Sequence, residues 1–144
     1  MLTLKRIDKN NDEFNLAYNI RLEVFTGEQN VPIGLLVDEF DKYAIQVAAY
    51  EDDMMAGCGR IVIDGKIGQI GRIAVLADKR KLGIGKLICE KLINIAIAEH
   101  NIDEVILNSQ CSAQKFYEKL GFTAVGSIYV KAGIEHVDMR KKLR

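Results

Sequence analysis

The feature that most constrains the fold is an apolar strand pattern that runs into a basic, glycine-containing turn and then into a long helical pattern. The apolar run covers 70–76, the turn Arg80–Gly85 reads Arg-Lys-Leu-Gly-Ile-Gly, and the helical pattern covers 84–99. The unpaired N–H groups of a first helical turn point outward, and the helix dipole adds partial positive charge there. Glycines let a phosphate approach the main chain. The segment therefore predicts an anion site in an α/β fold.

Spacing excludes two common phosphate-binding motifs. A P-loop needs a glycine where Arg80 stands and a hydroxyl side chain where Leu87 stands. A dinucleotide fingerprint needs a glycine three residues after Gly85, where Ile88 stands. What remains is the pattern Arg-x-x-Gly-x-Gly. The alternative interpretation is a short basic surface connection before a buried helix.

A second motif lies downstream, in the segment 110–122. It has an alanine, then a Phe-Tyr pair after two residues, and then Gly-Phe. By periodicity alone this segment is an amphipathic helix with Ser112 as N-cap and Gly121 as a left-handed stop. Periodicity does not explain why it follows the first motif by about one βαβ unit. Both motifs, in this order, resemble the GNAT superfamily of acyl-CoA-dependent N-acyltransferases.

The length of 144 residues predicts one domain, and the resemblance implies that this domain, 1–144, is an N-acetyltransferase (GNAT) domain. Asp12 is expected to cap a first helix that carries Phe25 and is ended by Gly27 and Pro32. Hydrophobic alternation and turn residues predict strands over 2–7, 44–50, 55–63, 67–76, 105–107, 123–130 and 135–139. The resemblance implies an α/β (α+β) fold with a mixed central sheet of about six to seven strands, splayed parallel strands and flanking helices.

Composition excludes several classes of function. The chain has 20 Lys and Arg against 20 Asp and Glu, and its basic residues are dispersed, so it lacks the footprint of a nucleic-acid binder. No apolar run approaches the ~20 residues that span a bilayer, and no signal peptide is recognisable. We therefore expect no nucleic-acid or membrane partner and a cytoplasmic location.

Cysteine and histidine spacing predicts neither a metal site nor a disulfide framework. The three cysteines lack Cys-x-x-Cys spacing, and the two histidines are far from them in sequence. Cys89 lies in the long helical pattern and is expected in the core. Cys111 follows the motif position Gln110, but no obvious base accompanies it, so a nucleophilic role is the weaker interpretation.

The GNAT resemblance implies acetyl-CoA as the cosubstrate and no metal. Main-chain groups of the strand 73–75 are expected to pair with the pantetheine arm like an added strand, and N–H groups of 81–86 are expected to hold the pyrophosphate. The cofactor-binding residues implied are Ile73, Ala74, Val75, Arg80, Lys81, Leu82, Gly83, Ile84, Gly85, Lys86, Gln110, Ala113 and Phe116.

The implied chemistry is acyl transfer from a thioester to an amine, through an oxyanion and with loss of a thiolate. A backbone N–H near Val75 is expected to stabilise the oxyanion. Tyr117 matches the position that protonates the departing sulfur in many relatives, and the alternative is an aromatic ring that only packs under the cofactor. Glu28 is the strongest candidate for the base.

An N-terminal pattern is similar to that of a subgroup of small bacterial GNAT proteins. The segment 21–32 contains Arg-x-x-Val-Phe followed by Glu-Gln and Pro, and an acidic segment follows at 38–41. The subgroup often carries a glutamate where Leu36 stands and a histidine where Gln46 stands. If either assists proton transfer in relatives, that assistance is absent here.

The predicted function is transfer of an acetyl group from acetyl-CoA to a primary amine, on a small molecule or a lysine side chain, by direct attack in a ternary complex. Carboxylates of Glu28, Asp38, Glu39 and Asp41 predict a pocket that attracts a cationic amine, with a solvated loop as the alternative. The competing function is a non-catalytic acyl-CoA sensor or regulatory module; a nucleotide-binding domain is a third. The acceptor amine stays open, and the chain is expected to be a monomer or homodimer.

Overall fold

The computed structural model describes residues 1–8 and 10–144. The described strands are β1 (Leu2–Ile7), β2 (Ile45–Glu51), β3 (Met54–Asp64), β4 (Ile67–Val75), β5 (Glu104–Gln110), β6 (Thr123–Lys131) and β7 (Ile134–Lys142). The α-helices are α1 (Asp12–Arg21), α2 (Ile84–His100) and α3 (Gln114–Lys119). Shorter helical turns are η1 (Leu22–Glu28), η2 (Ile33–Leu35), η3 (Glu39–Lys42), η4 (Ala77–Leu82) and η5 (Cys111–Ala113).

The strands of the described residues form one mixed sheet in the order β1-β2-β3-β4-β5-β7-β6. The first four strands make an antiparallel meander, and α2 crosses over to place β5 parallel to β4. The chain then turns back, so that β7 lies antiparallel to β5 and carries β6 at the edge. This α+β sheet with a parallel pair confirms the predicted fold class, and each predicted strand is present with ends shifted by a few residues.

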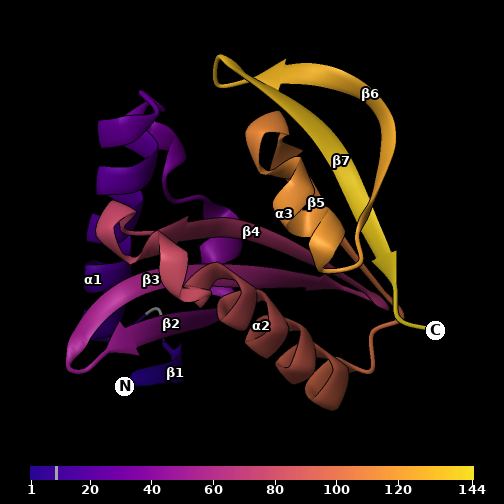
Figure 1. Ribbon diagram of the computed structural model, residues 1–144. Coiled ribbons are helices and arrows are strands. Elements are labelled where there is room, and N and C mark those ends of the chain that lie inside the picture. The colour runs from indigo at the N-terminus through magenta and orange to yellow at the C-terminus, as the bar shows by residue number, and fades with distance from the viewer. Residues whose placement is uncertain (9) are drawn as a thin grey trace.

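Helices cover both faces of the sheet because alternate strand residues point to opposite sides. On one face, Ile88 and Leu92 of α2 are fully buried against strand residues such as Val47. On the other face, Ala17 of α1 packs with Ala48, the strand residue next to Val47. Figure 1 shows α1 and α2 on different sides of the meander.

Two local predictions about the helices are wrong. Asn11, rather than Asp12, caps α1, because its side-chain oxygen accepts a hydrogen bond from the Glu13 amide at 2.7 Å. That helix also stops being α-helical at Arg21 and continues as the π-helical turn η1. Such wide turns are frequent at functional sites, and this one ends beside the turn that precedes α2.

The N-terminus of the second predicted helix is also different. Ser112 does not cap it; it lies inside the 3₁₀ turn η5, and α3 begins at Gln114 without a side-chain cap among the described residues. Gly121 does adopt the predicted left-handed conformation, with φ of 96°. The turn at Ala132 and Gly133 joins β6 to β7, with positive φ at both residues.

Candidate active site

The candidate site lies where β4 and β5 separate. The two strands pair from Ile67 to Ile70 of β4, opposite Glu104 to Leu107 of β5. Beyond that point the two strands no longer pair: β4 continues toward the N-terminal helices, and β5 continues beside the hairpin of β6 and β7 (Figure 1). A bulge sits at the same place, since Cys58 pairs with Ala74 but the next pair is Arg60 with Gly71. The parallel strands are splayed, as predicted.

A cleft of about 760 Å³ occupies this splay. Its volume lies in the range of roughly 300–1,000 Å³ that is typical of small-molecule sites. Nine of the residues predicted to form the site line it: Ile73, Ala74, Val75, Arg80, Gly85, Gln110, Ala113, Phe116 and Tyr117. The structure thus brings both sequence motifs to one cavity. Other predicted residues do not line it: Glu28, Lys81, Leu82, Gly83, Ile84 and Lys86.

The turn before α2 has the backbone geometry of an anion site. Gly83 is left-handed, with φ of 75°, and begins α2 without a side-chain cap among the described residues. A Cβ at Gly83 would meet nothing within 4 Å, whereas a Cβ at Gly85 would lie 3.1 Å from Phe116 Cζ. Ile84 is fully buried and anchors the first turn to the core. The free amides of this turn are therefore held on a rigid base.

Two contacts join the cleft walls to the end of η1. Arg80 donates from Nε to the Val75 carbonyl oxygen at 3.0 Å and from Nη2 to Glu28 at 2.7 Å. Gln110 Nε2 donates to Gln29 Oε1 at 2.7 Å. The predicted base and a predicted cofactor residue thus form an ion pair, in which the Glu28 side chain is 34% exposed.

Tyr117 is held by aromatic neighbours. Its ring makes edge contacts with Phe116 and Phe122, at centroid distances of 4.9 Å and 5.9 Å. Burial, and to a lesser degree the nearby Cys89, raise the pKa of the phenol above its usual value. The phenol is therefore protonated at neutral pH. Its hydroxyl has no hydrogen-bond partner within the described part of the chain.

The acidic segment is not the cation-attracting pocket that the sequence predicted. Asp41 is buried at 1% exposure and accepts from Arg21 at 2.9 Å and 3.1 Å, while Arg60 Nη1 lies 3.1 Å from it. Asp38 accepts from Arg60 at 2.6 Å and 2.9 Å, and from Arg72 at 3.1 Å. Both carboxylates are thus neutralised by arginines, and only Glu39 of this segment is exposed without a charge partner among the described residues.

Both departures from the subgroup pattern lie in this network. Gln46 Nε2 donates to Asp41 Oδ1 at 2.9 Å, and its Oε1 accepts from Arg21 at 3.4 Å. Leu36 is 1% exposed, and its carbonyl oxygen accepts from Arg21 and Arg72. Position 46 therefore supports a buried ion pair, and position 36 contributes a main-chain acceptor.

Arg21 and Asp41 form the centre of the network, and their charges explain its protonation state. Burial alone would raise the pKa of Asp41, but the hydrogen bonds and charge of Arg21 outweigh burial and hold that pKa well below its usual range. The Arg60 hydrogen bonds likewise lower the pKa of Asp38. Both carboxylates are therefore ionised at neutral pH.

Sequence reasoning missed six polar residues of the cleft: Arg60, Gln69, Arg72, Asn108, Lys131 and His136. The two arginines had a usable signal, because an arginine inside an apolar strand needs a partner or a ligand when it is buried. His136 is 7% exposed, and its Nδ1 donates to the Ile134 carbonyl oxygen at 2.7 Å in the tautomer that this contact favours. Its pairing opposite Gln110 exists only in the folded sheet.

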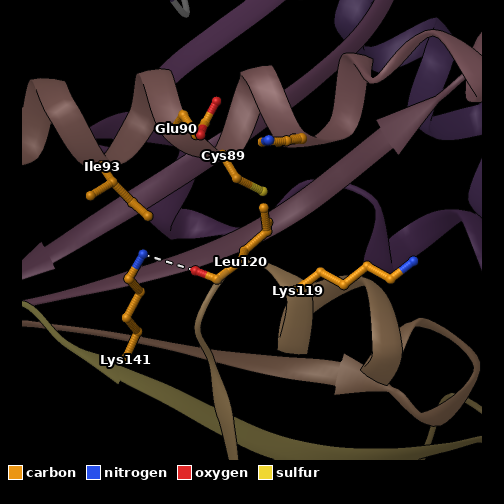
Figure 2. A pocket seen from close by; sticks show the side chains of 7 residues that line it. Cys89, Glu90, Ile93, Lys119, Leu120 and Lys141 are labelled. Atoms are coloured by element: carbon orange, nitrogen blue, oxygen red, sulfur yellow. Dashed lines mark hydrogen bonds between the residues drawn. The ribbon is translucent and has the colours of Figure 1, made fainter.

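A smaller cavity of about 190 Å³ lies between α2 and the end of α3 (Figure 2). Lys86 lines this cavity rather than the large cleft, together with Cys89 and Leu120. Lys141 Nζ donates to the Leu120 carbonyl oxygen at 2.8 Å. Cys89 is 1% exposed and is therefore a core residue, as predicted, and its burial raises the pKa of the thiol to about 12.

The described part of the chain offers neither a metal-binding cluster nor a membrane-spanning helix. Residues 1–8 and 10–144 hold no group of three or more His, Cys, Asp or Glu arranged to bind a metal ion. None of the helices in that part of the chain is both long and apolar enough to span a bilayer.

The chain resembles known proteins over nearly its whole length. The family model of the acetyltransferase (GNAT) domain matches residues 17–143. The uncharacterized N-acetyltransferase YjcF of Bacillus subtilis (strain 168) is 34% identical over 136 residues, which cover 94% of this chain and 96% of YjcF. An acyl-CoA N-acyltransferase structure from Pseudomonas aeruginosa is 25% identical, with a TM-score of 0.85 over 98% of this chain and 99% of that one.

A further solved structure shows the same fold at lower identity. It is an aminoglycoside 6′-N-acetyltransferase complexed with coenzyme A, 17% identical, with a TM-score of 0.77 over 97% of this chain and 96% of that one. The family match and the relatives cover nearly all of the sequence, including both motifs of the cleft. The chain therefore belongs to the GNAT acetyltransferase family, a family of acyl-CoA-dependent N-acyltransferases.

Proposed function

We propose that this protein transfers an acetyl group from acetyl-CoA to a primary amine by direct attack in a ternary complex. The observation that carries the proposal is the continuity of the cleft, which Arg80 and Gly85 line together with Tyr117 and Arg72. A cavity that joins an anion-binding turn to a proton donor and then to a polar region has room for both substrates.

The cofactor end fits a pyrophosphate. The left-handed Gly83 leaves space where a side chain would block an anion, and the first turn of α2 offers its free amides. Arg80 lies at the mouth of this turn and offers a guanidinium that is paired with Glu28 when no anion is bound. We assign the pantetheine arm to the main chain of 73–75, because β4 there faces the splay rather than β5.

The transfer itself forms a C–N bond and breaks the C–S bond of the thioester. We assign Tyr117 as the donor of a proton to the departing sulfur, since its phenol stays protonated and has no competing acceptor among the described residues. A main-chain N–H near Val75 would stabilise the oxyanion. The amine loses its proton to a base, for which we propose Glu28; because Glu28 lies outside the cleft lining, the proton would travel through water.

Free-thiol release from acetyl-CoA, measured with a panel of primary amines, tests the proposal. An acetyltransferase releases CoA thiol in proportion to added amine and yields the N-acetylated product by mass spectrometry. Binding of acetyl-CoA without amine-dependent release would instead support the sensor function. Absence of acetyl-CoA binding would contradict both.

A further inference from the structure

The part of the cleft away from the anion-binding turn is lined by cationic side chains. Arg60 of β3, Arg72 of β4 and Lys131 at the end of β6 all face it. Asp38 is the single carboxylate in the lining formed by the described residues. Asp138 of β7 lies near and keeps its negative charge, because the groups that donate to its Oδ1, the Asn108 amide and the Tyr129 hydroxyl at 2.6 Å each, are neutral.

Arg60 has a hydrogen-bond donor that the protein leaves unused. Its side chain is 7% exposed, and both terminal nitrogens bind Asp38. Its Nε is fully buried and has no partner within residues 1–8 and 10–144. A buried N–H of a charged group is costly to leave unpaired, so the protein by itself does not complete the hydrogen bonds of Arg60. Arg21 Nε is also unpaired, but Arg21 does not line the cleft.

Arg72 is held at the bulge of β4 in a left-handed conformation, with φ of 53°. Arginine adopts this conformation at an energetic cost, and such strain is concentrated at functional sites. Its Nε and Nη2 donate to the carbonyl oxygens of Leu36 and Leu35, and Nη2 also contacts Asp38. Its Nη1 makes no hydrogen bond to the described residues. Burial and then the charge of Arg60 lower the pKa of Arg72, as expected where cations outnumber anions.

The charges of the network do not cancel. Arg21, Arg60 and Arg72 share two aspartates, and the ion pairs among them leave one positive charge in excess. Lys131 adds a further positive charge at the cleft lining, and the Asp138 carboxylate nearby offsets it, so the excess stays at one. A cavity with walls of low dielectric focuses such a potential onto its contents. Guanidinium groups bind carboxylates and phosphates with particular strength, through charge-assisted hydrogen bonds.

We propose that the acceptor amine carries an anionic oxygen group, a carboxylate or a phosphate, which Arg60, Arg72 and Lys131 bind. The inference rests on the proposed function, and it replaces the cationic acceptor expected from the acidic segment. The amine end of such a substrate would point to the thioester near Tyr117, while the anion occupies the arginine end of the same cleft.

Matched pairs of amines test the proposal by kinetics. One pair is 4-aminobutyrate and 4-aminobutanamide; the other is O-phosphoethanolamine and ethanolamine. Charge-assisted hydrogen bonds predict kcat/KM at least about tenfold higher for the anionic member of one or both pairs. The pair that shows the preference identifies the source of the anion. Equal or better turnover of the neutral member in both pairs would overturn the proposal.

A binding measurement separates this inference from the proposed function. O-phosphoethanolamine and 4-aminobutyrate are titrated calorimetrically into the protein with CoA present, so that no transfer is required. Arg72→Gln should weaken binding of the preferred probe at least about tenfold, and Arg72→Lys should recover part of it because the charge is kept. Lys142→Gln removes an exposed charge of β7 outside the cleft and should change nothing.

The outcomes of the two experiments are distinct. If no amine is acetylated but the probes bind in an Arg72-dependent way, the proposed function fails and the anion site stands. If neither probe binds to wild-type protein at millimolar concentration, or if folded Arg72→Gln binds them as tightly as wild type, the anion site is rejected. Lys131→Gln, at an exposed position, replaces Arg72→Gln if circular dichroism shows that variant to be unfolded.

Discussion

At the scale of single residues, the burial of a polar group determines what chemistry it performs. Tyr117 lines the cleft and is a phenol in an aromatic environment, so burial keeps it neutral. Glu28 has the opposite surroundings, being partly exposed and paired with Arg80. The two proposed catalytic residues therefore require different tests.

Tyr117→Phe is expected to lower kcat by at least about tenfold, within the ~10²–10⁴ typical of a general acid, and to leave CoA affinity nearly unchanged. The substitution removes the hydroxyl and keeps the ring contacts with Phe116 and Phe122. Steady-state kinetics with an identified amine and calorimetry with CoA provide the two readouts. The control is Tyr43→Phe, at a side chain that is 67% exposed. Wild-type turnover of Tyr117→Phe would assign Tyr117 to packing.

Glu28→Gln is expected to reduce kcat and to flatten the rising limb of the pH-rate profile, because an amide cannot accept the proton of the amine. The profile is measured with saturating acetyl-CoA. If Glu28 only holds Arg80 in place through their ion pair, Glu28→Gln would instead raise the KM for acetyl-CoA and leave kcat unchanged. That result would remove Glu28 from catalysis and leave His136, in the cleft lining, as the group to test as base.

At the scale of elements, the strand-turn-helix unit of β4, η4 and α2 depends on two glycines for different reasons. Gly83 needs its left-handed φ of 75°, and a side chain added there would meet open space. Gly85 has ordinary backbone angles but lies close to Phe116 of α3. Gly83 is therefore required for the backbone conformation, and Gly85 is required for the close contact between the two motifs.

Gly85→Val is expected to weaken CoA binding at least about tenfold, since a β-branched side chain in the first turn of α2 would block the approach of the pyrophosphate. The new side chain would displace the Phe116 ring, whose Cζ lies 3.1 Å from the Cβ position, and narrow the cleft. Calorimetric titration of the folded variant with CoA measures the effect. Gly83→Ala is the companion variant, and its backbone conformation should cost about 1–2 kcal/mol of folding stability. Unchanged CoA affinity in Gly85→Val would reject this loop as the cofactor site.

At the scale of the whole molecule, one buried ion network connects the N-terminal helix to the sheet. Arg21 closes α1, Asp41 lies in η3, and Arg60 lies in β3, so the network joins segments that are far apart in the chain. Breaking a buried pair leaves an uncompensated charge, which is more costly than never having formed the pair. The network therefore supports the fold as well as the arginine end of the cleft.

Asp41→Asn is expected to lower the free energy of unfolding by about 3–5 kcal/mol, because Arg21 and Arg60 lose their shared carboxylate. Folding lowers the pKa of Asp41, so its contribution is fully present above the unfolded pKa of about 3.9 and is lost as pH falls through the lower folded pKa. Denaturant titrations at pH 7 and below pH 4 measure both effects. Asp53→Asn, at an exposed position, is the control. A loss as small as that of the control would contradict the structural role of Asp41.

Local sequence patterns were sufficient to predict the strands, the main helices and the family. Apolar patterns predict each strand, and the spacing within 80–85 and 110–122 gives the two motifs whose residues line the cleft. The end of α1 at Arg21 escaped prediction, because a π-turn has no marker in residue type. The prediction of Ser112 as a cap is wrong because Ser112 lies inside a 3₁₀ turn. The residue pattern of that turn does not differ from the pattern expected at the start of an α-helix.

The electrostatic surroundings of the acidic segment are visible only in the folded structure. In the sequence, Asp38 and Asp41 belong to an acidic segment. In the fold, their negative charges are cancelled by Arg21, Arg60 and Arg72, which lie in three other elements. Long-range pairing of this kind depends on strand register and on the bulge of β4, neither of which is encoded in a short window. A negative segment thus becomes part of a positively charged cleft, since electrostatics depends on distance in space rather than along the chain.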